Sequence, residues 1–467
     1  NTETSGKKKE EKKVNIIVQL EWIFGIRKDI LPNVFLLDKD TIVYPASKYI
    51  VIFNFTRNMG SLNLQHYING QMNSKGITTI ACSNMTRKIV GFSEDCNDGI
   101  SVSFCEITIK QGYKNYPKKQ NTFKFIEEKL NHTYCMAFSR RKKNDNYIVA
   151  LASNETDYYF IVWKWDSEVV RDPPFLKKIN LHEAKYEEQV ENYHDLSSSG
   201  SASMKEEPSE AAAQPNQSNL ESNNEPNVYK DEPIKINVKN HFEISFSSIN
   251  DNELFSLISK YSVVFYNISK SDVVENYRIG LVDEKGYKDY GTEIFGSAWL
   301  YDGEFCMVTD QYINIFDGKL KKLYQKIYNE NNVRIVTPYS LTTNFNGFIA
   351  GGINKSMIFY TKKTIEEENQ DGNPALQEKN TEQYVEAFKK TKFDFIPGVN
   401  EKITDDKVLQ NEKISVNDRP FDFLTIVTNY DEPYCIATTT NNDLILINTE
   451  EKEIDRALIK YLIAQFN

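Results

Sequence analysis

Histidine and acidic side chains are the residue types in this chain best suited to metal binding or proton transfer. The five histidines stand apart, without an HExxH motif or a His-x-His pair: His66, His132, His182, His194 and His241. Two of them, His182 and His194, lie beside the carboxylates Glu183, Glu187, Glu188 and Asp195. A metal site there is one hypothesis, and a solvated acidic loop is the alternative that we favour. We therefore expect no metal and no cofactor.

Motifs for nucleophilic catalysis or phosphate binding are absent from the sequence. There is no GxxxxGKS/T loop, no GxGxxG after an expected strand and no GxSxG elbow. Gly351-Gly352 falls at a tight connection between expected strands, where the missing Cβ is reason enough for glycine. The carboxylate pairs Asp405-Asp406 and Asp431-Glu432 fall in expected turns, which favour Asp on conformational grounds. We expect no catalytic residues, and hence no enzyme.

A run of positive charge provides the candidate interaction site. Arg140, Arg141, Lys142 and Lys143 are consecutive within SRRKKNDN, between two expected strands. Four adjacent cations on a hairpin loop could bind an acidic partner, for example a tubulin surface. A solvated hairpin tip has the same composition and is the simpler alternative.

Most of the net charge of −10 comes from one segment of the chain. Residues 183–232 contain twelve Asp and Glu against three Lys, a net charge of −9, so the remainder is nearly neutral. This balance argues against nucleic-acid binding through a broad basic face. No apolar run approaches the roughly 18 to 20 residues of a membrane span, so we expect a soluble chain without a membrane partner.

Cysteine and aromatic content favours an intracellular globular chain. The six cysteines show neither a CxxC motif nor any other metal-ligand spacing, so we expect reduced, buried thiols. The 27 Tyr, 27 Phe and 4 Trp argue against a disordered chain or a coiled coil, because such aromatic residues favour strands and a packed core.

Seven similar units follow one another along the chain. Each has an apolar strand, a polar turn, a strand of small and apolar residues, another turn and a β-branched or aromatic strand. In one unit these strands are YCMAFSR, NYIVALAS and YYFIVWKWD. The units occupy residues 33–54, 77–107, 134–166, 242–267, 295–317, 334–360 and 421–448. At about 48 residues per unit, they predict an all-β fold, a seven-bladed β-propeller with two polar insertions.

The expected propeller spans residues 14–467 and follows a flexible lead at 1–13. We expect Val14 to Ile23 to add a strand to the last blade and close the ring. The first insertion, at about 171–235, is too polar to offset chain entropy and should be disordered, either as a tolerated surface insertion or as a modified, partner-binding loop. The second, at about 362–412, should hold a short amphipathic helix through Tyr384, Val385, Ala387 and Phe388.

Particular motifs add a family resemblance. Trp165-Asp166, at the end of IVWKWD, is the dipeptide typical of WD repeats, although the Gly-His element is absent. FGIR, LLDKDTIVYPA, IVIFN, QHYING, GITTIACS and RKIVGFSE occur in this order between residues 24 and 94. Together they resemble the start of the cilia- and flagella-associated protein 57 family of WD-repeat axonemal proteins. Departures fall in connections: Asn69 replaces an expected Pro, Ser47 stands where Gly is usual, and Met59 to Leu64 lengthen a loop.

The resemblance implies a function and a location. It implies a non-catalytic scaffold of the axoneme in cilia or flagella, cytoplasmic before assembly, that helps to dock or regulate inner dynein arms on doublet microtubules. Its partners would be inner dynein arm and linker subunits, with tubulin as a further candidate. Members of the family continue into a second propeller and coiled coils. We therefore expect this chain to be about the N-terminal third of a longer protein, which could self-associate through a coiled coil outside this chain.

Two other classes of function remain open from the sequence. One is a general cytosolic WD-repeat adaptor outside cilia, in trafficking or ubiquitin-ligase assembly. The other is a propeller enzyme with a site in the central channel. Expression in non-ciliated cells would favour the adaptor, and stoichiometric binding of a metal or small molecule would favour the enzyme.

Overall fold

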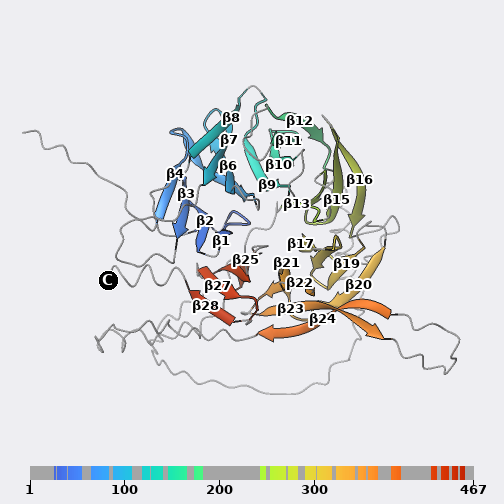
Figure 1. Ribbon diagram of the computed structural model, residues 1–467. Helices are drawn as coiled ribbons and strands as arrows, with labels where there is room; N and C mark the ends of the chain where they lie inside the picture. Colours follow the sequence, from blue (N-terminus) through green and yellow to red (C-terminus); the bar gives the residue numbers. More distant parts are fainter. Residues whose placement is uncertain are drawn as a thin grey trace, which may run out of the picture.

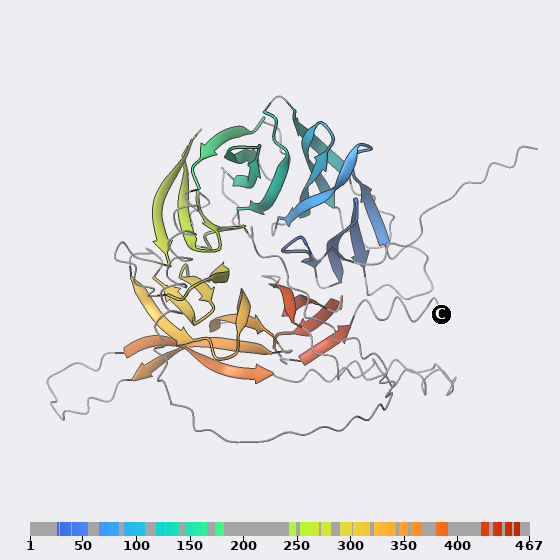
Figure 2. The same ribbon diagram turned by 180° about the vertical axis from the view of Figure 1, so that it is seen from behind.

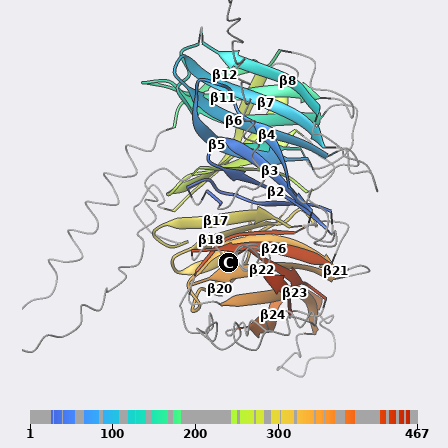
Figure 3. The same cartoon turned by 90° about the vertical axis from the view of Figure 1, so that its left-hand side faces the viewer.

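The structure, a computed structural model, describes residues between 26 and 457. Residues 55–64, 108–117, 166–172, 182–241, 282–289, 367–379 and 391–421 and several shorter intervals are not described. All described elements are strands, in seven four-stranded antiparallel sheets arranged as a ring (Figure 1). Each predicted unit supplies the three inner strands of one sheet, so the all-β, seven-bladed β-propeller is confirmed. Figure 2 shows the same ring from behind, and Figure 3 shows it from the side.

Each blade uses four consecutive strands in sequence order, from the centre of the ring to its rim. The innermost strands are β1 (Phe35–Asp38), β5 (Ser74–Cys82), β9 (His132–Phe138), β13 (Glu243–Phe246), β17 (Ile294–Trp299), β21 (Val333–Leu341) and β25 (Phe423–Thr428). The second strands are β2 (Thr41–Ala46), β6 (Lys88–Cys96), β10 (Asn146–Ser153), β14 (Leu254–Ile258), β18 (Phe305–Thr309), β22 (Phe345–Gly352) and β26 (Tyr434–Thr439).

The outer half of each blade is built from a third strand and a rim strand. The third strands are β3 (Tyr49–Asn54), β7 (Gly99–Ile107), β11 (Tyr158–Trp165), β15 (Ser262–Ser269), β19 (Tyr312–Phe316), β23 (Met357–Glu366) and β27 (Leu444–Asn448). The rim strands are β4 (Gln65–Asn69), β8 (Lys118–Phe125), β12 (Phe175–Ile179), β16 (Asp272–Gly280), β20 (Leu323–Tyr328), β24 (Asn380–Lys390) and β28 (Glu453–Ala457).

The core consists of seven apolar clusters, each between two neighbouring blades. β10 shows why period-two patterns suit this fold, since all eight of its residues are buried. Ile148 and Ala150 pack toward the second blade, whereas Val149 and Leu151 pack toward the fourth. Alternate residues of this strand therefore face the two neighbouring blades, instead of facing core and solvent in turn. A blade can bury both of its faces only by packing against both neighbours.

The ring closes where the first blade meets the last. Val34 and Tyr44 share an apolar cluster with Ile436 and Leu446. The Thr438 hydroxyl donates a hydrogen bond of 2.8 Å to the Asn33 side-chain carbonyl, which joins the two blades across 405 residues of sequence. The first and last blades each consist of four consecutive strands. The ring is therefore closed between them by side-chain packing and hydrogen bonding.

One sequence prediction is wrong, and others fall outside the described residues. The amphipathic helix expected at Tyr384 to Phe388 is instead β24, paired along its length with β23. Tyr384 and Phe388 are four positions apart in the sequence. Such a spacing is expected for two positions on one face of a helix, but because it is an even number it is also expected for one face of a strand, so the pattern alone does not distinguish the two. The interval 362–412 thus contains blade strands as well as an undescribed part. Val14 to Ile23 lies outside the described residues, and β28 forms the fourth strand of the last sheet.

Candidate functional site: the central channel and an interblade ion cluster

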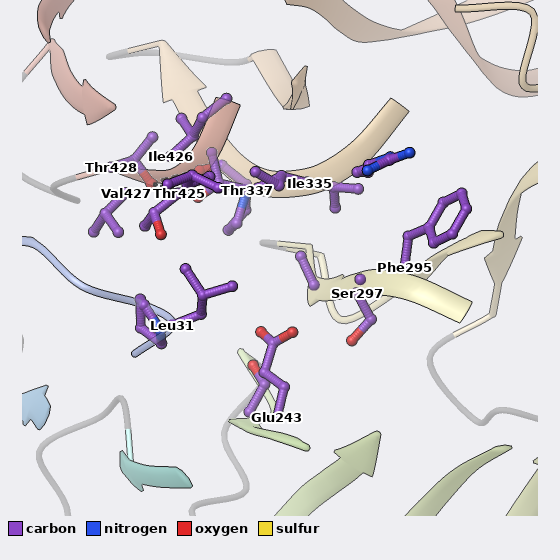
Figure 4. Close-up of a pocket in the computed structure, with 18 of the residues that line it drawn as sticks. Leu31, Glu243, Phe295, Ser297, Ile335, Thr337, Thr425, Ile426, Val427 and Thr428 are labelled. Atoms are coloured by element: carbon purple, nitrogen blue, oxygen red, sulfur yellow. Dashed lines mark hydrogen bonds between the residues drawn. The ribbon is translucent and has the colours of Figure 1, made fainter. Parts of the chain in front are cut away.

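The central channel contains a cavity of about 230 Å³. Its wall combines innermost strands of several blades with the segment that precedes β1, including Leu31, Glu243, Ser297, Thr337 and Thr425. Figure 4 shows these side chains around the open space. Small and hydroxyl-bearing residues on the innermost strands leave this space open where larger apolar side chains would fill it.

Close approach of two innermost strands shapes one wall of this cavity. Gly296 lies at an irregularity in the pairing of β17 with β18. A Cβ atom at residue 296 would lie 2.8 Å from the backbone carbonyl oxygen of Arg334. The fifth and sixth blades therefore require a glycine here for their observed spacing.

Charge in the cavity wall is unevenly placed. The carboxylate of Glu243 points into the middle of the open space (Figure 4). The Arg334 guanidinium lies over the Phe295 ring, 5.4 Å from its centroid. Phe295 lies away from Glu243 in the same view, so the negative charge faces the centre while the positive charge is held toward one side.

Cys82 is the cavity-lining residue with a thiol. Burial raises its pKa well above the ordinary value, against the opposing charge of Lys88. A thiol held in its protonated form is a poor nucleophile. The wall therefore combines a carboxylate with hydroxyl-bearing residues, and its thiol is not activated.

A second polar site, the ion cluster, joins the fifth and sixth blades. It comprises Asp302, Glu304, Lys362 and Tyr384. The Lys362 Nζ lies 2.7 Å from Asp302 Oδ2 and 2.9 Å from Glu304 Oε1. The Tyr384 hydroxyl donates a hydrogen bond of 2.7 Å to Glu304 Oε2. Both acids lie on the connection before β18, whereas the lysine and tyrosine lie on β23 and β24.

The rim strand β20 fixes the position of Tyr384 in this ion cluster. The backbone N–H of Tyr384 donates to the side-chain oxygen of Gln325 at 2.7 Å. The Gln325 amide nitrogen in turn donates to the Tyr384 carbonyl at 2.8 Å. A single side chain therefore satisfies two backbone groups on β24 and ties the rims of two blades together.

Burial is the largest single influence on the pKa values of Glu304, Tyr384 and Lys362. It raises the pKa of Glu304, with hydrogen bonds from Lys362 and Tyr384 opposing the shift. It also raises the pKa of Tyr384, in the same direction as the nearby acidic charges. For Lys362, burial alone would lower the pKa, but the bonds to both acids outweigh it and raise the pKa. At neutral pH the lysine stays charged and the tyrosine stays protonated, as suits a structural ion pair.

The structure describes some of the candidate residues of the sequence and leaves others out. His132 Nδ1 lies 2.8 Å from Asp95 Oδ2 and joins the second and third blades. The six cysteines are buried free thiols, as predicted. Residues Arg140, Arg141, Lys142 and Lys143 lie outside the described residues, and so do His182 and His194.

Two features are absent from the described part of the chain. Within it, no group of three or more His, Cys, Asp or Glu side chains is placed to hold a metal ion. None of its elements is a helix with the length and apolar character needed to cross a membrane.

The chain has a partial relative among curated proteins. No protein-family model matches the chain. Over 155 residues the chain is 26% identical to cilia- and flagella-associated protein 57 of Mus musculus. The matched region covers 33% of this chain and 11% of that relative, so the similarity spans only a small part of the relative's length.

Solved structures with a similar chain path have little sequence in common with this protein. A chain of the Mitotic Checkpoint Complex is 7% identical, with a TM-score of 0.45, covering 94% of this chain and 98% of that one. Sqt1 of Saccharomyces cerevisiae is 7% identical with a TM-score of 0.46, covering 93% and 86%. The Cps50 (Swd1) β-propeller domain of Myceliophteria thermophila is 10% identical with a TM-score of 0.34, covering 91% and 85%. These values carry no information about function.

Proposed function

We propose that this propeller is a non-catalytic scaffold of the ciliary or flagellar axoneme, where it helps to dock or regulate inner dynein arms on doublet microtubules. The observation that carries the proposal is the similarity to a cilia- and flagella-associated protein, together with a propeller fold. The motifs between residues 24 and 94 support it, because their order resembles the start of that family.

The architecture suits a scaffold role. Seven blades joined by buried clusters make a closed ring, which presents two faces and a continuous rim without requiring the blades to move. Inner dynein arm and linker subunits are the proposed partners, and Arg140 to Lys143 are the proposed contact for an acidic surface such as tubulin.

A general cytosolic WD-repeat adaptor is the second candidate function. The same propeller supports it, because this fold serves protein interaction in many settings. Under this proposal the protein would occur in non-ciliated cells and would not remain with the axoneme.

Fractionation of cilia separates the two candidates. The full-length protein, tagged in a ciliated cell, is followed through detergent extraction of the cilia and then through high-salt extraction. Retention after detergent supports the axonemal proposal, whereas release with the membrane and matrix fraction contradicts it. A variant in which Arg140 to Lys143 are replaced by Gln then tests whether this basic segment contributes to retention.

A further inference from the structure

Exposed apolar side chains gather on one part of the propeller rim. Among the described residues, the exposed large apolar side chains are Met72, Ile126, Val274, Tyr277, Tyr324 and Tyr328. The last four lie on β16 and β20, the rim strands of the fourth and fifth blades. These two strands follow one another around the ring (Figure 1). Such a concentration of exposed apolar surface is typical of an interaction site.

Val274 and Tyr277 lie on the face of the fourth blade that is turned toward the fifth. Their partners on the adjacent strand β15 are Asn267 and Phe265, which share one face of that strand. The Phe265 ring lies 6.3 Å from the Tyr277 ring and 5.0 Å from the ring of Phe305 in the fifth blade. Val274 is 51% exposed and Tyr277 is 43% exposed, so both remain accessible beside this contact between the blades.

The fifth blade turns Lys326 and Tyr328 toward the fourth. Their partners on β19 are Asn314 and Tyr312. These two share a face with Phe316, which belongs to the apolar cluster between the fourth and fifth blades. The Tyr312 ring lies 5.7 Å from the Tyr328 ring, and its centroid lies 3.9 Å from Lys326 Nζ. Tyr328 is 63% exposed, and Lys326 is exposed as well.

The rim patch comprises the exposed residues Val274, Tyr277, Lys326 and Tyr328. Its single charge is positive, and the two acids of β16 are turned toward the third blade. Asp272 forms an ion pair with Lys177 of that blade. Glu275 pairs with Tyr266, which belongs to the cluster on that side. Residues 319–328 contain four lysines and no acid, in a chain of net charge −10. A complementary partner segment therefore combines negative charge with apolar side chains.

We propose that the rim patch binds an acidic, extended segment of a partner protein that carries apolar side chains between its carboxylates. The Lys326 ammonium has three N–H donors, so a carboxylate can be added to the contacts that it already makes. The rings of Tyr277 and Tyr328 offer apolar surface together with a hydroxyl group. β16 and β20 are also the outermost strands of their sheets, where an extended chain can approach. This inference goes beyond the proposed function and applies equally to an axonemal scaffold and a cytosolic adaptor.

Calorimetric titration of the 467-residue chain with short peptides tests the proposal. The probe is acetyl-Glu-Leu-Glu-Leu-Glu-amide, and the comparison peptide has Gln in place of each Glu, which removes the charge and keeps the size. We expect the acidic peptide to bind and the neutral peptide to bind about fivefold more weakly, a factor corresponding to about 1 kcal/mol. Equal binding of the two peptides, or no binding of the acidic peptide, overturns the proposal.

Matched variants identify the surface. Lys326→Met keeps the apolar stem, so it should weaken the acidic peptide about fivefold and leave the neutral peptide unchanged. Tyr328→Ser should weaken both peptides, because it removes apolar contact surface. Lys124→Met, at an exposed lysine of the rim strand β8, is the matched control and should change neither. Thermal melting confirms that the variants are folded, and unchanged binding of the acidic peptide by Lys326→Met overturns the assignment.

A second copy of this chain is the competing occupant of the rim patch. Sedimentation velocity of the wild type and of Tyr328→Ser over a range of concentrations separates the two cases. Self-association that is lost in the variant would assign the rim patch to a second copy and overturn the proposal, whereas a monomeric wild type supports it. Axonemal retention is measured separately, so a failure of peptide binding leaves the proposed function standing, and a failure of retention leaves the rim patch standing.

Discussion

Replacing Lys362 with methionine is the sharpest test of how the blades are held together. Its ammonium group lies between two carboxylates, and the side chains of Lys362, Asp302 and Glu304 are 16%, 21% and 12% exposed. Methionine keeps the apolar stem but leaves the two acids together without their cation. Removing one partner of a buried ion pair costs about 3 to 5 kcal/mol, and we expect about 3 kcal/mol here because the ion cluster retains some solvent contact.

The loss of stability caused by Lys362→Met should depend on pH in a defined direction. Burial already raises the pKa of Glu304, and removal of Lys362 removes a hydrogen bond that opposes this rise. A carboxyl whose pKa is raised on folding contributes stability that is present below its unfolded pKa and is lost as the pH rises through its folded pKa. The destabilisation by Lys362→Met should therefore be largest at neutral pH and should shrink toward the ordinary pKa of 4.5 for Glu304.

Urea denaturation of the wild type and the variant, at neutral pH and near pH 4, measures this difference. Lys177→Met is the matched control, because the Lys177–Asp272 pair is 39% and 49% exposed and its loss should be undetectable. A loss below about 1 kcal/mol at neutral pH would refute the reasoning, since that is the scale of an exposed pair. An equal loss at both pH values would refute the role of the carboxylates.

Three further changes test the fold. Trp165→Ala should cost about 3 to 5 kcal/mol, because Trp165 is 3% exposed and packs edge-on against Phe138 between two blades; a loss below about 1 kcal/mol in denaturant would contradict this packing. Gly296→Ala should cost about 1 to 3 kcal/mol, since its Cβ would meet a backbone carbonyl, and an unchanged melting curve would contradict the close approach of β17 to β21. Deletion of residues 197–227 should leave the melting temperature within a few degrees, and a large drop would show that this segment is packed.

The three inner strands of each blade could be predicted from the sequence, whereas most rim strands could not. Inner and middle strands are buried on both faces, so β10 stands out as NYIVALAS. A rim strand is half exposed, as in β20, where partly buried and exposed residues alternate along LYQKIY. Its polar residues resemble those of a connecting loop, so the rim strands were missed or, at Tyr384, assigned to a helix.

The polar sites depend on contacts that a single sequence does not reveal. Lys362 lies 60 residues from Asp302, and the two meet only because the fifth and sixth blades pack together. Glu243 is the first residue of β13, where the sequence alone suggests an ordinary strand end. The one available signal was position, since an acidic residue on an innermost strand of a propeller lies close to the central channel.

Ser47 shows how a departure from an expected residue can be accommodated. It stands where glycine was expected, and its φ of 57° lies in the left-handed region that glycine adopts freely. The turn between β2 and β3 therefore keeps the backbone shape that favours glycine, although its residue differs.

Electron tomography of axonemes from cells with and without the gene tests the central claim most directly. The axonemal proposal predicts that deletion removes density beside the inner dynein arms and reduces the occupancy of one or more of those arms. Restoring the tagged full-length protein should restore both and should place the tag at that position. Axonemes with unchanged density and a full set of inner arms would contradict the proposal and would favour the cytosolic adaptor.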